Sequence, residues 1–413
     1  MARLTILDGV RGYFLVLMFL NHLTFAGGYL LVKVNHGEVA FVEGAQGFVF
    51  LSGLLAGLVH TRRLVGQGFS AATGMIWQRA AEIYAYALGC ILVVLTLQTL
   101  LPESRLYWHH WLGDLQFGRR RLVAASALLL YQPDFLDILP QYVIYLLAAP
   151  LLIVLCVRGR SAFIVAGCVV LWLAVQFGLH LPLAASIEGV MPLRAYFNVL
   201  AWQLLFVGGL IIGSNMAQGR IDWNRFFRSD RPQLAIVAAV LVAAFAICRV
   251  WTIHFTMPDT MMTRFMALAN RGEFGMVYLL NFAALGYLVT WIIRVGPATA
   301  SVPLRRLSLA LDRLFSLSFL RLLGRNSLQV YAWHVIMVYL LKAADHNWGP
   351  FGEATKTAMA TAGIALLAMP ALMLERWRRP GRNRKASISI TIQPLRHRPT
   401  RRRRRDLVGR PVD

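Results

Sequence analysis

Long apolar runs set the first constraint on this chain. Runs of about 18 or more apolar residues recur up to about residue 374, and each is long enough to cross a bilayer as a helix. These runs are continuous rather than alternating in polarity, which favours helices over a membrane barrel. Apolar residues make up 58% of the 413 and charged residues only 15%, against about 25% in soluble proteins. The sequence therefore predicts an all-α polytopic membrane protein.

We expect about ten transmembrane helices within one domain, residues 1–374, followed by a basic, disordered tail, residues 375–413. The apolar run 122–131 is too short to cross and is predicted to form a re-entrant or interfacial half-helix. The expected spans are 10–31, 39–60, 80–101, 138–157, 162–180, 197–217, 233–252, 274–294, 326–343 and 357–374.

The distribution of Lys and Arg predicts the orientation. These residues are in surplus in the loops on the side of the N-terminus, and an even number of spans returns the Arg-rich tail to that side. By the positive-inside rule both termini are predicted to be cytoplasmic, in the inner membrane of a bacterium. A basic segment after a last span more often holds topology or contacts anionic lipid than nucleic acid. Membrane lipid is therefore an expected partner, and nucleic acid is not.

Cysteine and histidine spacing gives no support for a disulfide or a metal site. No CxxC and no HExxH motif occurs in the sequence, and a metal is not expected. The four cysteines, all within predicted spans, are Cys90, Cys156, Cys168 and Cys248.

The first span carries polar residues on one face. Arg11 and His22 are eleven residues apart, about 20° from the same helix face and about 16 Å apart along the axis. Asp8 precedes Arg11 by three residues, close enough to pair with it, and Asn21 adjoins His22. Ionisable residues inside a membrane are functional candidates. We expect this face to line a reaction chamber.

The ninth span repeats this arrangement. Arg325 lies at its cytoplasmic entry, and His334 lies about 13 Å deeper if the helix is continuous. Two parallel examples in one chain predict a polar cavity shared by His22 and His334.

Other polar residues at the starts of spans are candidates with structural alternatives. Ser52 either faces the chamber or belongs to a small-residue packing surface, and Gln46 opens the same stretch. Asp137 lies at the entry of the fourth span, where a helix cap would suffice to explain it. Trp202 and Gln203 either join helices by hydrogen bonds or contact a sugar.

This set of residues suits acyl transfer across the membrane. A neutral histidine is a suitable base for a hydroxyl proton, and arginines bind phosphates in a bidentate manner. An acyl-CoA could therefore anchor at Arg11 and reach His22. A transporter or flippase for a polyanion or lipid-linked sugar is the alternative, in which the same groups form a relay. A structural or assembly role would leave the aligned cations and histidines unexplained.

Several motifs resemble the acyltransferase-3 superfamily of membrane O-acyltransferases. They are Asp8–Gly12 with the Arg-x10-His spacing, Gln46–Gly53, and Leu323–Leu328 followed by His334. Leu136–Tyr142, Phe197–Phe206 and Ser327–Val330 are more similar to one branch, the OpgC family, although Val199 stands where that branch has proline.

The resemblance implies a ten-span bundle with a central chamber. It implies acylation, by succinyl transfer, of sugar hydroxyls on periplasmic glucans. The donor would be an acyl-CoA such as succinyl-CoA, with no tightly bound cofactor. We expect catalytic roles for His22 and Asp8. Substrate contacts are expected from Arg11, Asn21, Gln46, Ser52, Asp137, Trp202, Gln203, Arg325 and His334.

Overall fold

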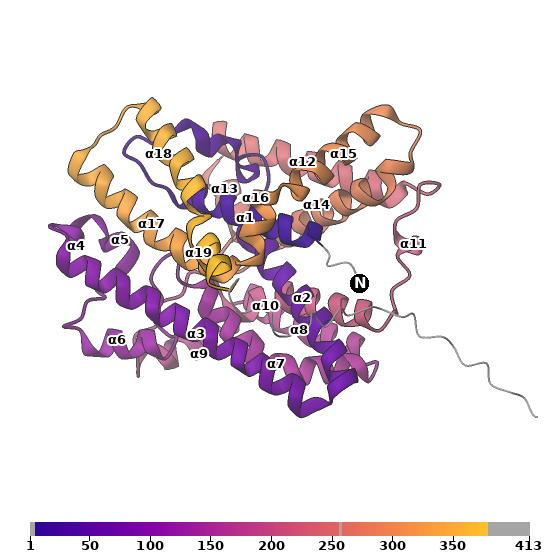
Figure 1. Cartoon of the computed structure of the whole chain (residues 1–413), viewed down its shortest axis with the longest axis horizontal. Helices are drawn as coiled ribbons and strands as arrows, with labels where there is room; N and C mark the ends of the chain where they lie inside the picture. Colours follow the sequence, from indigo (N-terminus) through magenta and orange to yellow (C-terminus); the bar gives the residue numbers. More distant parts are fainter. Residues whose placement is uncertain (1–4, 256–257, 379–413) are drawn as a thin grey trace, which may run out of the picture.

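The computed structural model describes residues 5–255 and 258–378, and the regular elements in these ranges are helices (Figure 1). The all-α prediction is confirmed. The predicted basic tail lies outside the described residues from 379 onward. Its first four residues continue the last helix, α19 (Met369–Arg378), so the helical domain extends past the expected boundary at 374.

Within residues 5–255 and 258–378, seven helices are long and apolar enough to cross a membrane, and an eighth span is added if a pair bent by 72° counts as one. The polytopic all-α class is confirmed, although this count differs from the expected number of about ten. The helices concerned are α2 (Gly44–Gln67), α3 (Phe69–Leu100), α7 (Ile138–Val157), α10 (Val199–Ala217), α12 (Gln233–His254), α14 (Met276–Val295) and α18 (Glu353–Leu366) with α19; the bent pair is α8 (Ser161–Gln176) with α9 (Leu181–Glu188).

The two remaining expected spans are α1 (Thr5–His22) and α17 (Ser327–Trp348), which carry the two candidate histidines. No residue of α1 is exposed. This helix lies in the middle of the molecule and contacts α2, α17 and α18 (Figure 1). A helix enclosed by protein does not need a lipid-compatible surface, so its polar residues are tolerated. Neither α1 nor α17 is among the helices that length and composition select as spans, whereas α12 is.

Glycines bring α1 against two neighbouring helices, α15 (Val302–Ser316) and α16 (Ser318–Arg325). A Cβ on Gly9 would lie 1.7 Å from the Phe315 carbonyl oxygen, and one on Gly12 would lie 1.9 Å from that of Leu320. Conversely, a Cβ on Gly324 would lie 1.8 Å from the Asp8 carbonyl oxygen. Backbone contact at this distance fixes where α1 sits and leaves no space for larger side chains.

A second glycine contact joins α2 to α10. A Cβ on Gly53 would lie 1.9 Å from the Phe206 carbonyl oxygen, and one on Gly57 would lie 2.1 Å from that of Leu210. Gly209 approaches the Phe50 carbonyl oxygen in the same way. The small residues around Ser52 therefore form a helix-packing surface, as one of the two interpretations predicted.

The neighbouring glycines of α10 offer a matched test of this contact. In Gly209→Ala the new Cβ would lie 2.2 Å from the Phe50 carbonyl oxygen, whereas at Gly208 it would meet nothing within 4 Å. We expect Gly209→Ala to lower the free energy of unfolding by roughly 1–3 kcal/mol through overpacking and Gly208→Ala to leave it nearly unchanged. Melting of the purified variants in detergent would measure this. Equal melting temperatures for the two variants would contradict the close contact.

Candidate active site

The site is centred on a pair of imidazoles. His22, the last residue of α1, meets His334 of α17, with His22 Nδ1 3.1 Å from His334 Nε2 and the ring centroids 5.3 Å apart. The His334 side chain is fully buried, and the His22 side chain is half-buried. The structure thus brings together the two histidines that the sequence predicted to share a polar cavity.

The hydrogen bonds of this pair fix which nitrogen carries each proton. His334 Nδ1 lies 2.5 Å from the Tyr331 carbonyl oxygen, which can only accept, so Nδ1 must be the donor. In neutral His334 the other nitrogen, Nε2, is then an acceptor, and His22 Nδ1 must donate to it. Nε2 of neutral His22 therefore carries a free lone pair. Across the residues that the structure describes, this nitrogen has no hydrogen-bond partner.

A second polar contact joins the same two helices at the other end of α1. Arg11 Nη2 donates to Ser327 Oγ at 2.5 Å, and the guanidinium carbon lies 5.4 Å from the centre of the Phe48 ring. Along a helix the two contacts are separated by about 16 Å. One face of α1 therefore presents a cation at one end and a base at the other, as predicted.

Asp137 is buried directly before α7, with 4% of its surface exposed. It occupies the N-cap position of α7, but its side chain makes no capping hydrogen bond. Burial raises the pKa of this carboxyl to about 7, although nearby Arg271 acts in the opposite direction. Asp137 can therefore change its protonation state near neutral pH.

Arg271 is a residue of this region that the sequence did not single out. Its Nη2 lies 2.5 Å from the Glu43 carboxylate, and its charge is close enough to act on both His22 and Asp137. Glu43 in turn donates its backbone N–H to Gln46 Oε1 at 3.1 Å, and the Gln46 side chain is fully buried. A loop arginine has no local sequence signal; only the fold brings it beside α1 and α2.

Trp202 and Gln203 have structural partners. Trp202 Nε1 donates to the carbonyl oxygens of Arg271 and Gly272 at 3.2 and 3.1 Å. Gln203 Nε2 donates to the Cys168 carbonyl oxygen at 2.8 Å and so joins α10 to α8. The Gln203 bond joins two helices, as one interpretation predicted, whereas the Trp202 bonds join α10 to the loop that follows α13 (Asp259–Leu268). Contact with a sugar stays a prediction.

The remaining candidates are Asp8, Asn21, Ser52 and Arg325, of which Asn21 adjoins His22 in the sequence. Asp8 is buried in α1 fourteen residues before His22, about 21 Å along the axis. Asn21 is half-buried beside His22, and Ser52 is buried within α2. Arg325 is exposed, and its Nη1 lies 3.9 Å from Glu375.

The prediction that Arg325 and His334 lie on one continuous helix is wrong. Helix α16 ends at Arg325, and α17 begins at Ser327 after a break at Asn326. Ser327, rather than Arg325, faces Arg11 across the two helices. Within the described ranges, no group of three or more His, Cys, Asp or Glu residues is arranged to hold a metal ion.

The fold and this site define a polytopic α-helical membrane protein with a buried polar centre suited to general-base chemistry. The family model described as OpgC protein matches residues 3–379, nearly the whole chain. The chain belongs to the OpgC family. Membership suggests an O-acyltransferase that acts on periplasmic glucans, and it implies a bacterial membrane. No curated protein and no solved structure matched the chain.

The raised pKa of Asp137 predicts a pH-dependent stability. The folded protein keeps this proton up to about pH 7, whereas an unfolded aspartate loses it near pH 4. The folded state therefore binds more protons within that window, and stability falls as pH rises through it. An asparagine side chain cannot ionise, so the variant Asp137→Asn should lack this part of the fall.

Melting temperatures in detergent between pH 4 and pH 8 would measure the difference. Asp114, which is exposed, provides the control variant Asp114→Asn, for which we expect the wild-type profile. Coincident profiles for Asp137→Asn and the wild type would show that Asp137 is already ionised throughout this window.

Proposed function

We propose that this protein transfers an acyl group, succinyl in the simplest case, from a cytoplasmic acyl-CoA to a hydroxyl of an extracytoplasmic glucan. The observation that carries the proposal is the His22–His334 pair. Its hydrogen bonds leave Nε2 of His22 as an unprotonated base on a helix whose other end carries Arg11. General-base removal of a hydroxyl proton needs such a nitrogen, held in one tautomer.

His22 moves one proton in two steps. Its Nε2 takes the proton of the sugar hydroxyl while the sugar oxygen attacks the thioester carbonyl carbon. The tetrahedral intermediate then collapses: the carbon–sulfur bond breaks, and the proton on Nε2 passes to the departing CoA sulfur. The products are a sugar ester and CoA with a free thiol, and His22 returns to its starting tautomer.

His334 supports the charge that forms in between. When Nε2 gains its proton, His22 becomes a cation whose Nδ1–H still donates to His334 Nε2 at 3.1 Å. His334 can keep accepting because its own proton is held on Nδ1 by the Tyr331 carbonyl oxygen. An orienting partner of this kind is a recurrent feature of histidine bases. Because His334 acts through His22, it is a positioning residue.

Arg11 suits the donor at the opposite end of α1. CoA carries phosphates on one end of a long flexible arm and the thioester on the other, and a guanidinium binds phosphate oxygens in pairs. The separation of about 16 Å along α1 would place the phosphates at Arg11 while the thioester lies at His22. In this arrangement Arg11 faces the cytoplasm, both termini are cytoplasmic, and the glucan reaches His22 from the periplasm across the inner membrane.

Removal of the base tests the function. Purified protein with succinyl-CoA and a periplasmic glucan should release CoA thiol and form a glucan ester detectable by mass spectrometry. His22→Ala should lower the rate by about 10²–10⁴-fold, the usual contribution of a general base. The exposed His109 provides a control, and His109→Ala should retain the wild-type rate.

Equal turnover by His22→Ala and the wild type would remove His22 from the chemistry. Movement of the glucan into liposomes without any change in its mass would favour transport instead.

A further inference from the structure

A tight turn carries an aromatic ring into the site. The Leu136 N–H donates to the Pro133 carbonyl oxygen at 3.1 Å and closes a turn over residues 133–136. Phe135, the third residue of this turn, has φ +70°, a conformation that turns usually reserve for glycine or asparagine. A bulky side chain at positive φ costs free energy, so neighbouring contacts must hold it there.

Two tyrosines of α17 hold the turn. Tyr331 Oη donates to the Phe135 carbonyl oxygen at 2.6 Å, and Tyr339 Oη donates to that of Asp134 at 3.3 Å. The Asp134 N–H also donates to the Trp111 carbonyl oxygen at 3.0 Å. The turn is therefore fixed to the same helix that carries His334.

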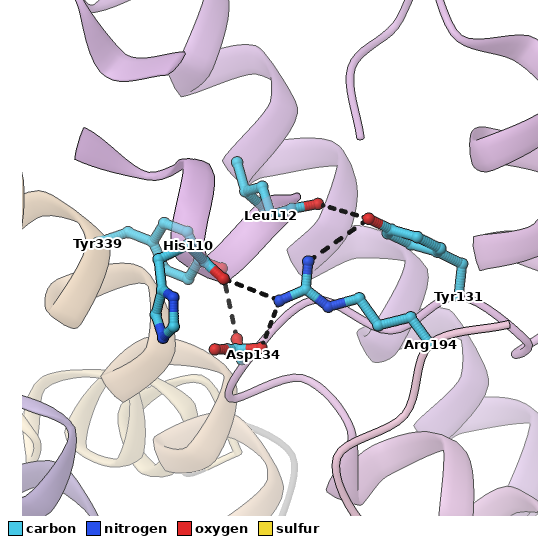
Figure 2. Close-up of polar contacts among 6 residues, drawn as sticks. All are labelled: His110, Leu112, Tyr131, Asp134, Arg194 and Tyr339. Carbon is cyan, nitrogen blue, oxygen red and sulfur yellow. Dashed lines mark hydrogen bonds and ion pairs between the residues drawn. The ribbon is translucent and has the colours of Figure 1, made fainter. Parts of the chain in front are cut away.

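An arginine fixes the turn from the other side. Arg194 Nη2 donates to Asp134 Oδ1 at 2.8 Å and to the His110 carbonyl oxygen at 2.9 Å, while Nη1 donates to Tyr131 Oη at 3.4 Å (Figure 2). Figure 2 shows Arg194 lying between Asp134 and Tyr131. The long segment between α3 and α7 is thereby tied together around the turn.

The result of these contacts is the position of one ring. The Phe135 ring centroid lies 4.3 Å from that of His22, with 32° between the planes, and 5.1 Å from that of Trp111. Strain that is kept in place by several independent contacts is typical of functional sites.

We propose that Phe135 shields His22 from water, so that the activated hydroxyl is that of the glucan. This inference rests on the proposed function. Water that reached Nε2 of His22 would give up a proton in place of the sugar, attack the thioester carbonyl carbon and release a free carboxylic acid and CoA thiol. An apolar ring over the imidazole removes space for that water, and exclusion of water prevents such side reactions.

The test is the ratio of glucan ester formed to acyl-CoA hydrolysed. In Phe135→Gly the ring is absent while the backbone conformation is relaxed, and we expect the ratio to fall at least about tenfold (about 1.4 kcal/mol). Leu129 provides a matched control because it also has positive φ, +62°, in the same segment. Leu129→Gly relaxes the backbone without removing a ring from His22 and should keep the wild-type ratio.

If Phe135→Gly fails to fold, Phe135→Leu provides a second test. It keeps apolar bulk but lacks the planar ring, and its ratio should lie between those of the wild type and Phe135→Gly. An unchanged ratio in either folded Phe135 variant, including one in which both rates fall together, would overturn the proposal.

A second measurement does not depend on the proposed reaction. Diethylpyrocarbonate acylates an unprotonated imidazole nitrogen, and peptide mass spectrometry would report its rate at His22. The reaction should be faster in Phe135→Gly than in the wild type or Leu129→Gly. Equal rates would overturn the shielding, whereas wild-type protein that neither transfers nor hydrolyses acyl groups would overturn the proposed function alone.

Discussion

A hydrogen bond between two neutral imidazoles is the interaction on which the arrangement of this site depends. His334 is fully buried and both of its ring nitrogens are hydrogen-bonded. Loss of either partner there would cost about 1–3 kcal/mol, so α1 and α17 must be held at one spacing and one register. Glycine contacts place α1 against α15 and α16, and the bond from Arg11 to Ser327 fixes a second point along the pair. The His22–His334 and Arg11–Ser327 contacts lie at opposite ends of α1 and together prevent α1 from sliding along α17.

The same requirement explains how polar residues are distributed among the helices. A helix with few buried residues, such as α12, is almost entirely apolar, while α1 has no exposed residue and carries Asp8, Arg11, Asn21 and His22. Enclosure by protein removes the penalty that lipid would impose on these groups. In the described part of the chain, length and hydropathy consequently select seven or eight spans, because they measure compatibility with lipid rather than position in the bundle.

The sequence predicted those features of the site that follow from local geometry. The register of Arg11 and His22 follows from the helical repeat, and the structure confirms it. The association of His22 with His334 was inferred from two similar patterns, but their contact of 3.1 Å depends on the packing of helices over 300 residues apart. Asp137 has the sequence pattern of a helix cap and occupies the N-cap position of α7, yet its side chain makes no capping hydrogen bond.

Arg271 and Phe135 reach the site only through long-range contacts, and no sequence pattern predicted either of them. Arg271 lies in a loop, and only the approach of that loop to Glu43 brings its charge near Asp137. Phe135 is one of many phenylalanines in the chain, and its significance lies in a backbone angle that a single sequence does not reveal. Identifying either residue required the long-range contacts.

Tyr331 contacts both parts of the site, the histidine pair and the Phe135 turn. Its backbone carbonyl oxygen holds the proton of His334 on Nδ1, which sets the tautomer of His22. Its side-chain hydroxyl donates to the Phe135 carbonyl oxygen and so holds the ring over His22. The base and its apolar cover are thus positioned from the same turn of α17, and a shift of that turn would displace both. A fully buried tyrosine with both polar groups engaged resists such a shift, since either group would lose its partner in an apolar environment.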